Sequence, residues 1–301
     1  MFAIRCGRRC HAPSDEHGVG RGAYVILCVR RCGRSREVAV RADTAIGEHQ
    51  CDRRASVSIL PRGVSYDPLM DRAAQASWET WWVEGEACFA AVVATLEADA
   101  LTGPSLLPGW DRATVIAHVA TNADALSNLL RWAATGVPTP MYPSPEARRR
   151  AIAETASLPR DQLVARAESA RGELAARMHD LAPEAWDRPV ETRDGRAIVA
   201  REVVWMRCRE VWVHAVDLAA GVGFESMPPA LLVALADDIV AMWARRSVMA
   251  PCRLVAGEHA WGVEPPVVEV DLATAVAVLS GRTPLETLGP AVAGLGMPAW
   301  I

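Results

Sequence analysis

Residues 111–136 are DRATVIAHVATNADALSNLLRWAATG. Their apolar side chains recur at steps of three and four residues, which is the spacing of one face of an α-helix. Asp111 is a good N-cap, and Gly136 is of the type that commonly follows the last residue of a helix. We therefore predict an amphipathic helix between these two residues, with His118 as a titratable group among apolar neighbours. The apolar face consists of Val115, Ile116, Val119, Leu126, Leu129 and Leu130.

The chain on both sides of this helix has similar patterns. One amphipathic helix is predicted over 70–101, and Ser144 followed by Pro145 predicts the start of another. Helical periodicity resumes after Pro159, and a further helix is expected over about 199–220. Residues 70–220 thus contain four long helices with short links, which is typical of a helix bundle.

The pattern changes toward the end of the sequence. Pro228 and Pro229 predict the start of a helix that continues to about Arg245. The stretches RLVAGEHAWGV and PVVEVDL are expected as strands, and ATAVAVLSGR as a short helix. We therefore expect a mainly α protein with a helix bundle over 70–247, followed by a small α+β domain over 248–301.

Residues 1–69 differ from the rest of the chain. They have no sustained helical or strand periodicity, and they contain five of the eight cysteines, including the pairs CGRRC and CVRRC near His11 and His17. A helical pattern then begins at Met70. The segment is predicted to be a disordered extension or a mis-assigned start; the alternatives are an ordered appendage and a small zinc site, for which the Cys spacing is permitted but loose.

The composition of the 301 residues excludes several classes of function. The formal net charge is -4, so the chain as a whole has no electrostatic reason to bind nucleic acid or an anionic membrane. No apolar stretch approaches the length of a membrane span, and the three scattered cysteines after Met70 suit a reducing, cytoplasmic compartment. All 32 basic residues are Arg, which indicates a GC-rich genome of the actinomycete type.

The segment REVWVHAVDL, residues 209–218, contains the strongest chemical signal. Glu210 and His214 are one helical turn apart, and Asp217 continues the same stripe. A carboxylate and an imidazole at this spacing can provide two ligands to zinc or a similar cation, and His118 on a facing helix is the leading candidate for the third. The alternatives are an exposed Glu–His pair and a hydrogen-bonded core histidine.

Several motifs together resemble the mycothiol-dependent maleylpyruvate isomerase family. They are LPGWDRATVIAHVATNADALSNLLRWAATG, PMYPSPEARRRAIAE, REVWVHAVDLAAG and the final GMPAW, in that order over residues 72–300. The resemblance implies a DinB-like four-helix bundle in which His118, Glu210 and His214 bind a divalent metal, normally zinc. It also implies an Arg near the site from the PMYPS region and another from an LxGR motif, here Arg148 and Arg282.

The resemblance further implies a reaction. The thiol mycothiol is held as a thiolate by the metal, adds to the cis double bond of maleylpyruvate, permits rotation and is then eliminated to give fumarylpyruvate. Because this substrate is a dicarboxylate, Arg148 and Arg282 are expected to clamp it. For Arg282, the alternative is capping the end of the helix before it. Asp217 is expected to orient His214.

Three functions remain open from the sequence. The first is this isomerase, acting in aromatic compound degradation. The second is a mycothiol S-transferase that acts on another electrophile through the same metal site. The third is a non-catalytic metal-binding or regulatory protein built on the same bundle, such as a partner of a sigma-factor system. The presence of both Arg148 and Arg282, which are expected to bind the two substrate carboxylates, favours the isomerase.

Overall fold

The computed structural model describes residues 5–6, 23–31, 34–42, 68–262 and 265–300, with side chains described from Ser77 onward. It divides into two compact units, Met1–Val64 and Ser65–Ile301. In the first unit, strands β1 (Arg5–Cys6), β2 (Ala23–Arg31) and β3 (Arg34–Ala42) form an antiparallel sheet in the order β1-β2-β3. The sequence did not predict these strands, and the suggested zinc site of the cysteine pairs lies outside the described side chains.

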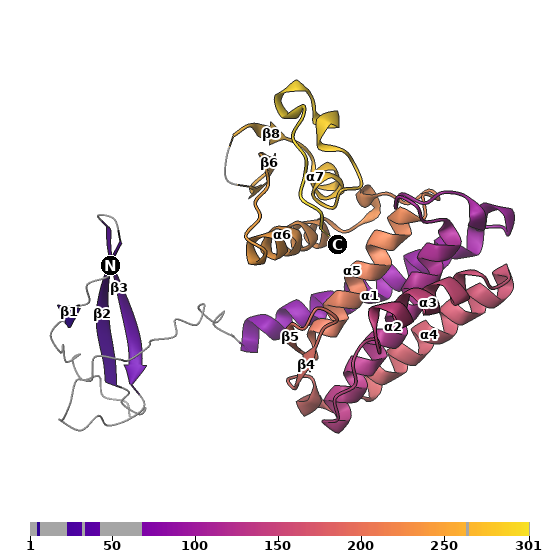
Figure 1. Ribbon diagram of the computed structural model, residues 1–301, viewed down its shortest axis with the longest axis horizontal. Coiled ribbons are helices and arrows are strands. Elements are labelled where there is room, and N and C mark those ends of the chain that lie inside the picture. Colours follow the sequence, from indigo (N-terminus) through magenta and orange to yellow (C-terminus); the bar gives the residue numbers. More distant parts are fainter. Residues whose placement is uncertain (1–4, 7–22, 32–33, 43–67, 263–264, 301) are drawn as a thin grey trace. The chain divides into compact units, whose positions relative to one another are not determined.

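The second unit is mainly α, as predicted, and its larger part is a bundle of long helices (Figure 1). Helices α1 and α5 pack against each other, α2 packs against α4 and α5, and the shorter α3 lies against α2. A short antiparallel hairpin, β4–β5, precedes α5. The bounds of these elements are α1 Pro68–Thr95, α2 Arg112–Thr135, α3 Pro145–Ala156, α4 Arg160–Asp180, β4 Pro189–Glu191, β5 Ala197–Val199 and α5 Glu202–Asp217, with 3₁₀ turns at Asp99–Thr102 and Pro183–Ala185.

Local capping explains where the central helices begin and end. The Asp111 carboxylate accepts a hydrogen bond from the Thr114 backbone N–H, which fixes the start of α2. Gly136 ends α2 with a φ of 72°, a left-handed conformation that glycine adopts without steric cost. The Ser144 hydroxyl caps α3 in the same way as Asp111 caps α2. These caps confirm the helix limits that were predicted from the sequence.

The α1–α5 contact is close because α1 has a glycine at the crossing. A Cβ atom on Gly85 would lie 2.6 Å from the Trp212 ring and 2.7 Å from the Val211 side chain. The indole N–H of Trp212 donates to the backbone carbonyl of Trp81 on α1 at 2.7 Å. Trp212 therefore faces α1, away from Glu210 and His214, and fixes the rotation of α5 about its own axis.

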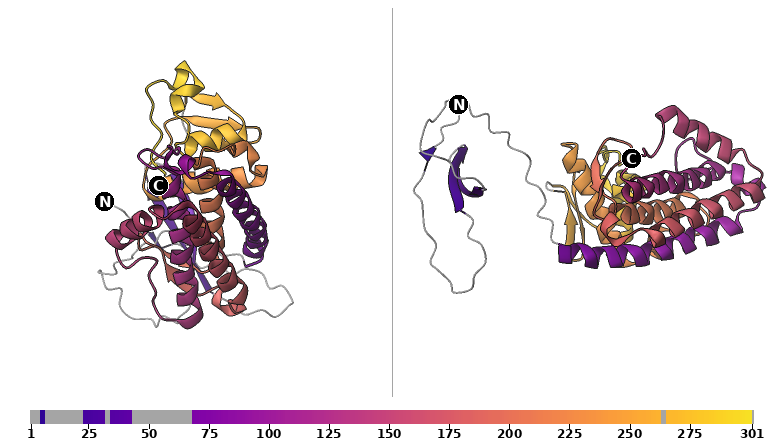
Figure 2. Two further views of the ribbon diagram at one scale, coloured as in Figure 1. Left: turned by 90° about the vertical axis from the view of Figure 1, so that its right-hand side faces the viewer. Right: turned by 90° about the horizontal axis from the view of Figure 1, so that it is seen from below.

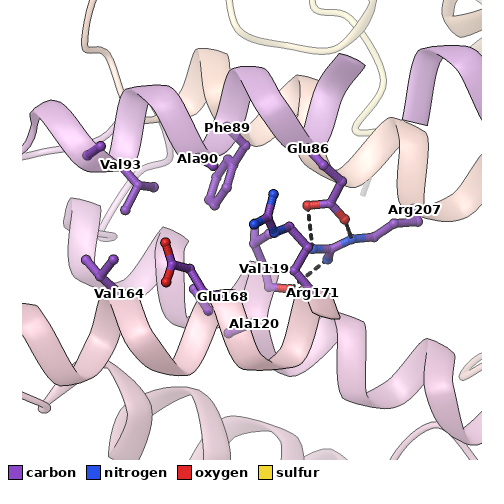
Figure 3. A pocket seen from close by; sticks show the side chains of 12 residues that line it. Glu86, Phe89, Ala90, Val93, Val119, Ala120, Val164, Glu168, Arg171 and Arg207 are labelled. Atoms are coloured by element: carbon purple, nitrogen blue, oxygen red, sulfur yellow. Dashed lines mark hydrogen bonds and ion pairs between the residues drawn. The ribbon is translucent and has the colours of Figure 1, made fainter. Parts of the chain in front are cut away.

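A buried ion pair crosses the bundle beside a small cavity (Figure 3). Arg207 on α5, of which only 1% is exposed, donates to both carboxylate oxygens of Glu86 on α1 at 2.7 and 3.3 Å. Its remaining nitrogen donates to the Val119 carbonyl and to Asn122. The cavity of about 50 Å³ lies between this pair and the apolar side chains of Phe89, Val93 and Val164. Because these contacts satisfy the charges, the pair is compatible with its burial.

The C-terminal part packs beside α5 (Figures 1 and 2). Its sheet has the order β7-β6-β8, with β6 antiparallel to β7 and parallel to β8. Helix α6 packs against α7 and β7. The elements are α6 Pro229–Arg245, β6 Arg253–Ala256, β7 His259–Trp261, β8 Val267–Glu269 and α7 Leu272–Leu279, with 3₁₀ turns at Phe224–Ser226, Leu285–Leu288 and Pro290–Val292.

Within the part of the chain that the structure describes, no helix is both long and apolar enough to cross a membrane.

Candidate metal centre

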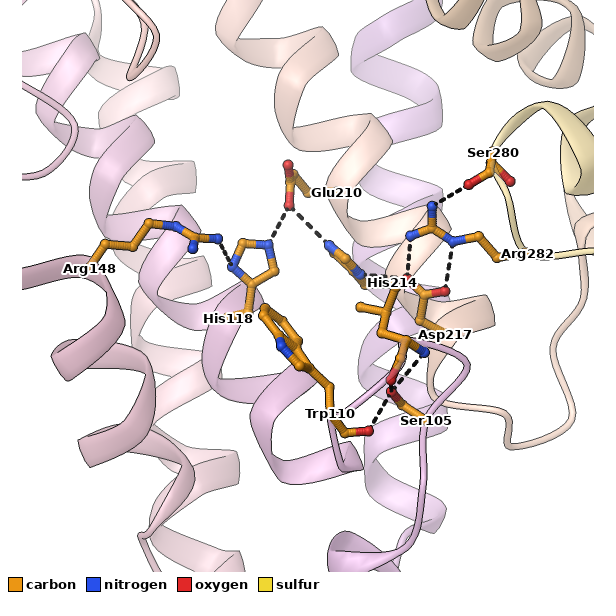
Figure 4. A network of polar contacts seen from close by, with 10 residues as sticks. Ser105, Trp110, His118, Arg148, Glu210, His214, Asp217, Ser280 and Arg282 are labelled. Atoms are coloured by element: carbon orange, nitrogen blue, oxygen red, sulfur yellow. Dashed lines mark hydrogen bonds and ion pairs between the residues drawn. The ribbon is translucent and has the colours of Figure 1, made fainter. Parts of the chain in front are cut away.

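Three potential metal ligands from two helices converge at one end of the bundle (Figure 4). The Glu210 Oε2 atom lies 3.1 Å from His118 Nε2 and 3.3 Å from His214 Nε2. One donor atom from each of the three side chains lies within 4.8 Å of the other two. Two imidazoles and a carboxylate are a ligand set that suits zinc and its neighbours, and three protein ligands leave a coordination position for another group.

His214 is held by a chain of charged hydrogen bonds that runs into the C-terminal part. Its Nδ1 lies 2.8 Å from Asp217 Oδ2, and Asp217 is fully buried. Arg282 Nε and Nη2 donate to the two Asp217 oxygens at 2.9 and 2.8 Å. Because the Asp217 carboxylate only accepts, His214 carries a proton on Nδ1, and Nε2 is the ring nitrogen that faces Glu210.

His118 is held in the opposite proton arrangement. Arg148 Nη2 lies 3.2 Å from His118 Nδ1. A guanidinium can only donate, so Nδ1 of His118 accepts, and its proton lies on Nε2, which then donates to Glu210. A histidine that binds a cation through Nε2 needs the reverse arrangement, with the proton on Nδ1. The contact with Arg148 and metal binding by His118 Nε2 therefore exclude each other.

Two aromatic side chains flank this half of the site. Trp110, in the loop before α2, has its ring 5.5 Å from that of His118 in an edge-on arrangement. The guanidinium carbon of Arg148 lies 5.7 Å from the centre of the Tyr142 ring. Neither aromatic residue was expected at the site from the sequence, because both lie in loops, where helical periodicity gives no signal.

Burial and mutual contacts shift the pKa values of the site residues. Burial lowers the pKa of His118, and the bond to Glu210 opposes this shift only in part. Burial acts against the charged form of Glu210, but hydrogen bonds and charge from His118 and His214 outweigh it and hold the pKa of Glu210 well below its usual range. Burial would lower the pKa of His214, yet Asp217 and Glu210 together raise it. The site thus keeps an ionised carboxylate between two histidines.

The structure brings all six predicted site residues into one network, with a different arrangement of the two arginines from the one expected. Arg148 contacts His118, and Arg282 directs its fork at Asp217 while its Nη1 donates to the Ser280 carbonyl at 2.8 Å. The contact with Ser280 also matches the alternative of a helix cap. Arg282 is therefore positioned to orient Asp217. Its Nε and Nη2 atoms, which would form the two parallel hydrogen bonds to a substrate carboxylate, already donate to Asp217.

Comparison with known proteins identifies the family. The family model of the mycothiol maleylpyruvate isomerase N-terminal domain matches residues 82–219. Two crystal structures are similar, one of a mycothiol-dependent maleylpyruvate isomerase and one of a histidine-to-alanine mutant. Each is 35% identical to this chain, covering 69% of it and 90% of the matched chain, with TM-scores of 0.67 and 0.66. The chain belongs to the mycothiol-dependent maleylpyruvate isomerase family. No curated protein matches it at a significant level.

Membership of the maleylpyruvate isomerase family confirms the mainly α fold with a DinB-like bundle. The matched range ends at residue 219, two residues after α5, which agrees with the packing of α6 on the C-terminal part. All three potential ligands lie inside the matched range, whereas Arg282 lies outside it. The chemistry of the site is thus divided between the bundle and a part of the chain that follows it.

Proposed function

We propose that the protein is a thiol- and metal-dependent cis–trans isomerase that converts maleylpyruvate to fumarylpyruvate with mycothiol. The observation that carries the proposal is the convergence of His118, Glu210 and His214, with donor atoms within 4.8 Å of one another, in a chain of this family. The side chains are 5–12% exposed, so they are shielded but open to a small ligand.

The residues present fit a divalent cation. Glu210 is an ionised carboxylate, and the Asp217 contact at Nδ1 leaves Nε2 as the nitrogen with which His214 would bind a cation. His118 would be the third ligand once Arg148 leaves its Nδ1. A cation held there would supply the positive charge that keeps a thiol ionised near neutral pH.

The roles of the surrounding residues follow from their contacts. Asp217 orients His214, and Arg282 holds Asp217 with two charge-assisted hydrogen bonds. Arg148, once it has left His118, offers a planar guanidinium to a carboxylate of the substrate. Mycothiol would supply the sulfur nucleophile, since its addition to the double bond leaves a single bond that can rotate before elimination.

One observation favours a second candidate function. Two arginine clamps were expected for a dicarboxylate, and the fork of Arg282 is occupied by Asp217. Of these two arginines, only Arg148 would then be left to bind a substrate carboxylate. The site therefore also suits a mycothiol S-transferase whose electrophile carries fewer charges. A non-catalytic metal-binding protein would use the same ligands without turnover.

The test is turnover by zinc-loaded protein with and without mycothiol. Maleylpyruvate is followed by absorbance, and the product isomer is identified by NMR. Mycothiol-dependent formation of fumarylpyruvate supports the isomerase. Consumption of mycothiol with a panel of electrophiles, but no isomerisation, identifies the S-transferase. No reaction in either assay, despite bound metal, rejects both enzymes.

A further inference from the structure

Trp300 lies where the last segment of the chain meets the site. Only 2% of this residue is exposed, and the guanidinium carbons of two arginines, Arg209 and Arg282, each lie 5.6 Å from the centre of its ring. Such an arrangement is attractive because the negative face of an indole favours a cation, most strongly when the pair is shielded from water.

These two arginines are linked to the potential metal ligands on α5 in different ways. Arg209 directly precedes Glu210 in the sequence. Arg282 holds Asp217, which in turn holds the Nδ1 proton of His214. Trp300 therefore contacts Arg282, and Arg282 contacts Asp217, the residue that fixes the orientation of His214.

The backbone around Trp300 is fixed independently of the site. The indole N–H of Trp243 on α6 donates to the Ala299 carbonyl at 3.2 Å, and Arg246 Nη1 donates to the Trp300 carbonyl at 2.9 Å. Helix α6 and the residue that follows it thus hold the segment in place, and the Trp300 ring lies against Arg282.

Trp300 contacts its surroundings through the faces of its ring rather than through its indole N–H. Among the described residues, Trp300 Nε1 is buried and has no hydrogen-bond partner. By contrast, the buried Trp261 of the same part of the chain donates its N–H to Asp237 at 2.7 Å. A phenyl ring at position 300 would therefore lose no hydrogen bond, whereas the same change at position 261 would.

We propose that Trp300 is a positioning residue of the metal centre, which holds Arg282 where Arg282 can orient Asp217 and, through it, His214. The inference rests on the proposed function insofar as His214 is a metal ligand. It goes beyond that function by assigning a role in the site to a residue that touches no ligand.

The first measurement is the affinity of the full-length protein for Co²⁺, followed by its absorption spectrum. Trp300→Leu should weaken binding about fivefold, since loss of a residue that orients a metal ligand usually costs tenfold or more and Trp300 acts on Asp217 only through Arg282. Trp300→Phe should bind within about twofold of the unaltered protein because it keeps an aromatic face. Trp261→Leu, a matched loss of a buried indole, should leave Co²⁺ affinity unchanged.

A double-mutant comparison separates positioning from general destabilisation. In an Arg282→Leu background, Trp300→Leu should cause no additional loss of affinity, because its effect passes through Arg282. Equal losses in both backgrounds, or unchanged affinity in Trp300→Leu, would overturn the proposal. Circular dichroism at the working temperature ensures that every variant compared is folded.

The second measurement needs no metal. The Nδ1–H proton of His214 can be followed by NMR and assigned through its loss in His214→Gln. Trp300→Leu should shift or broaden this signal, whereas Trp300→Phe and Trp261→Leu should not. A signal that is unchanged in Trp300→Leu rejects the inference. If the unaltered protein binds no Co²⁺ while the signal responds as expected, the metal-centre proposal fails and the positioning role of Trp300 stands.

Discussion

Arg148 would compete with a bound metal for His118, because the guanidinium needs a lone pair on Nδ1, whereas binding of a cation to Nε2 needs a proton on Nδ1. If Arg148 also receives the substrate, metal loading releases it for that task. The order of events would then be cation first and dicarboxylate second, without any separate regulatory element.

This competition predicts that Arg148→Ala raises the zinc affinity while it lowers turnover. Removing one hydrogen bond of about 1 kcal/mol should strengthen zinc binding roughly fivefold. Affinity is measured by competition with a chelating dye. Arg149→Ala is the control, since it removes the same charge from the exposed surface of α3, where Arg149 pairs with Glu146. An equal rise in both variants would mean that charge alone is responsible.

Asp217 is predicted to control the metal affinity through His214. Asp217→Asn keeps the size of the side chain but loses the charge that both His214 and Arg282 contact. Zinc affinity should fall about 10- to 100-fold, measured by the same dye competition. The control is Asp124→Asn, which loses a carboxylate paired with Arg166 on another face of the bundle. Unchanged affinity in Asp217→Asn would remove the residue from the site.

The sequence could predict the three potential ligands but not how their neighbours are bonded. Glu210 and His214 follow from helical spacing, and His118 from its place on a second helix. The contact of Arg282 with Asp217 joins residues 65 positions apart in different parts of the chain, and no local pattern reports such a pairing. A substrate clamp and an orienting residue have the same sequence signature, so only the fold distinguishes them.

At the scale of elements, the helices with strong caps and the C-terminal strands β6, β7 and β8 were predicted well, whereas strands β1, β2 and β3 and the start of α5 were not. Asp111, Gly136 and Ser144 mark their helix ends through local hydrogen bonds and backbone conformation, which a sequence reveals. Helix α5 begins at Glu202 instead of about residue 199, because Ala197–Val199 pairs with β4 as a strand. Pairing within this hairpin thus overrides the local helical preference of Ala197–Val199.

The α1–α5 crossing predicts opposite effects for two glycine substitutions. Gly85→Ala places a methyl group against Trp212 and Val211, and this overpacking should destabilise the protein by about 1–3 kcal/mol. The higher helix propensity of Ala should offset about 1 kcal/mol of that loss. Gly172→Ala on α4 meets no atom within 4 Å and should stabilise the protein by up to about 1 kcal/mol.

Both variants are measured by chemical denaturation against the unaltered protein. A stabilising effect of Gly85→Ala would show that α1 and α5 can separate at no cost. In that case Trp212 would not fix the rotation of α5, and the placement of Glu210 and His214 would need another explanation.

At the scale of the whole molecule, metal binding should be linked to folding. His118 and Glu210 are 92 residues apart in the sequence, so the three donors converge only in the folded chain. Zinc at 100 times its Kd should therefore add about 2.7 kcal/mol to stability and raise Tm by roughly 5–10 °C. Differential scanning calorimetry measures the shift. His118→Ala should fold but show little of it; an equal shift in that variant would place the bound zinc elsewhere.

Residues 1–69 are predicted to be dispensable for the fold and the site. The unit Ser65–Ile301 is compact by itself, and all three potential metal ligands lie within it. A chain that begins at Met70 should keep its Tm and zinc affinity, as measured by calorimetry and dye competition. Aggregation or loss of zinc binding after this truncation would show that the first segment contributes to the folded unit.

The link between Asp217 and Arg282 also has a consequence during synthesis. The ribosome adds about 5–20 residues per second, and Arg282 follows Asp217 by 65 residues, so the carboxylate is made several seconds before the guanidinium that neutralises it. Until then, burying Asp217 would leave part of its charge uncompensated, which is costly. The end of α5 should therefore stay hydrated on the nascent chain, and the candidate metal centre should reach its final form only after the C-terminal part has been translated and docked.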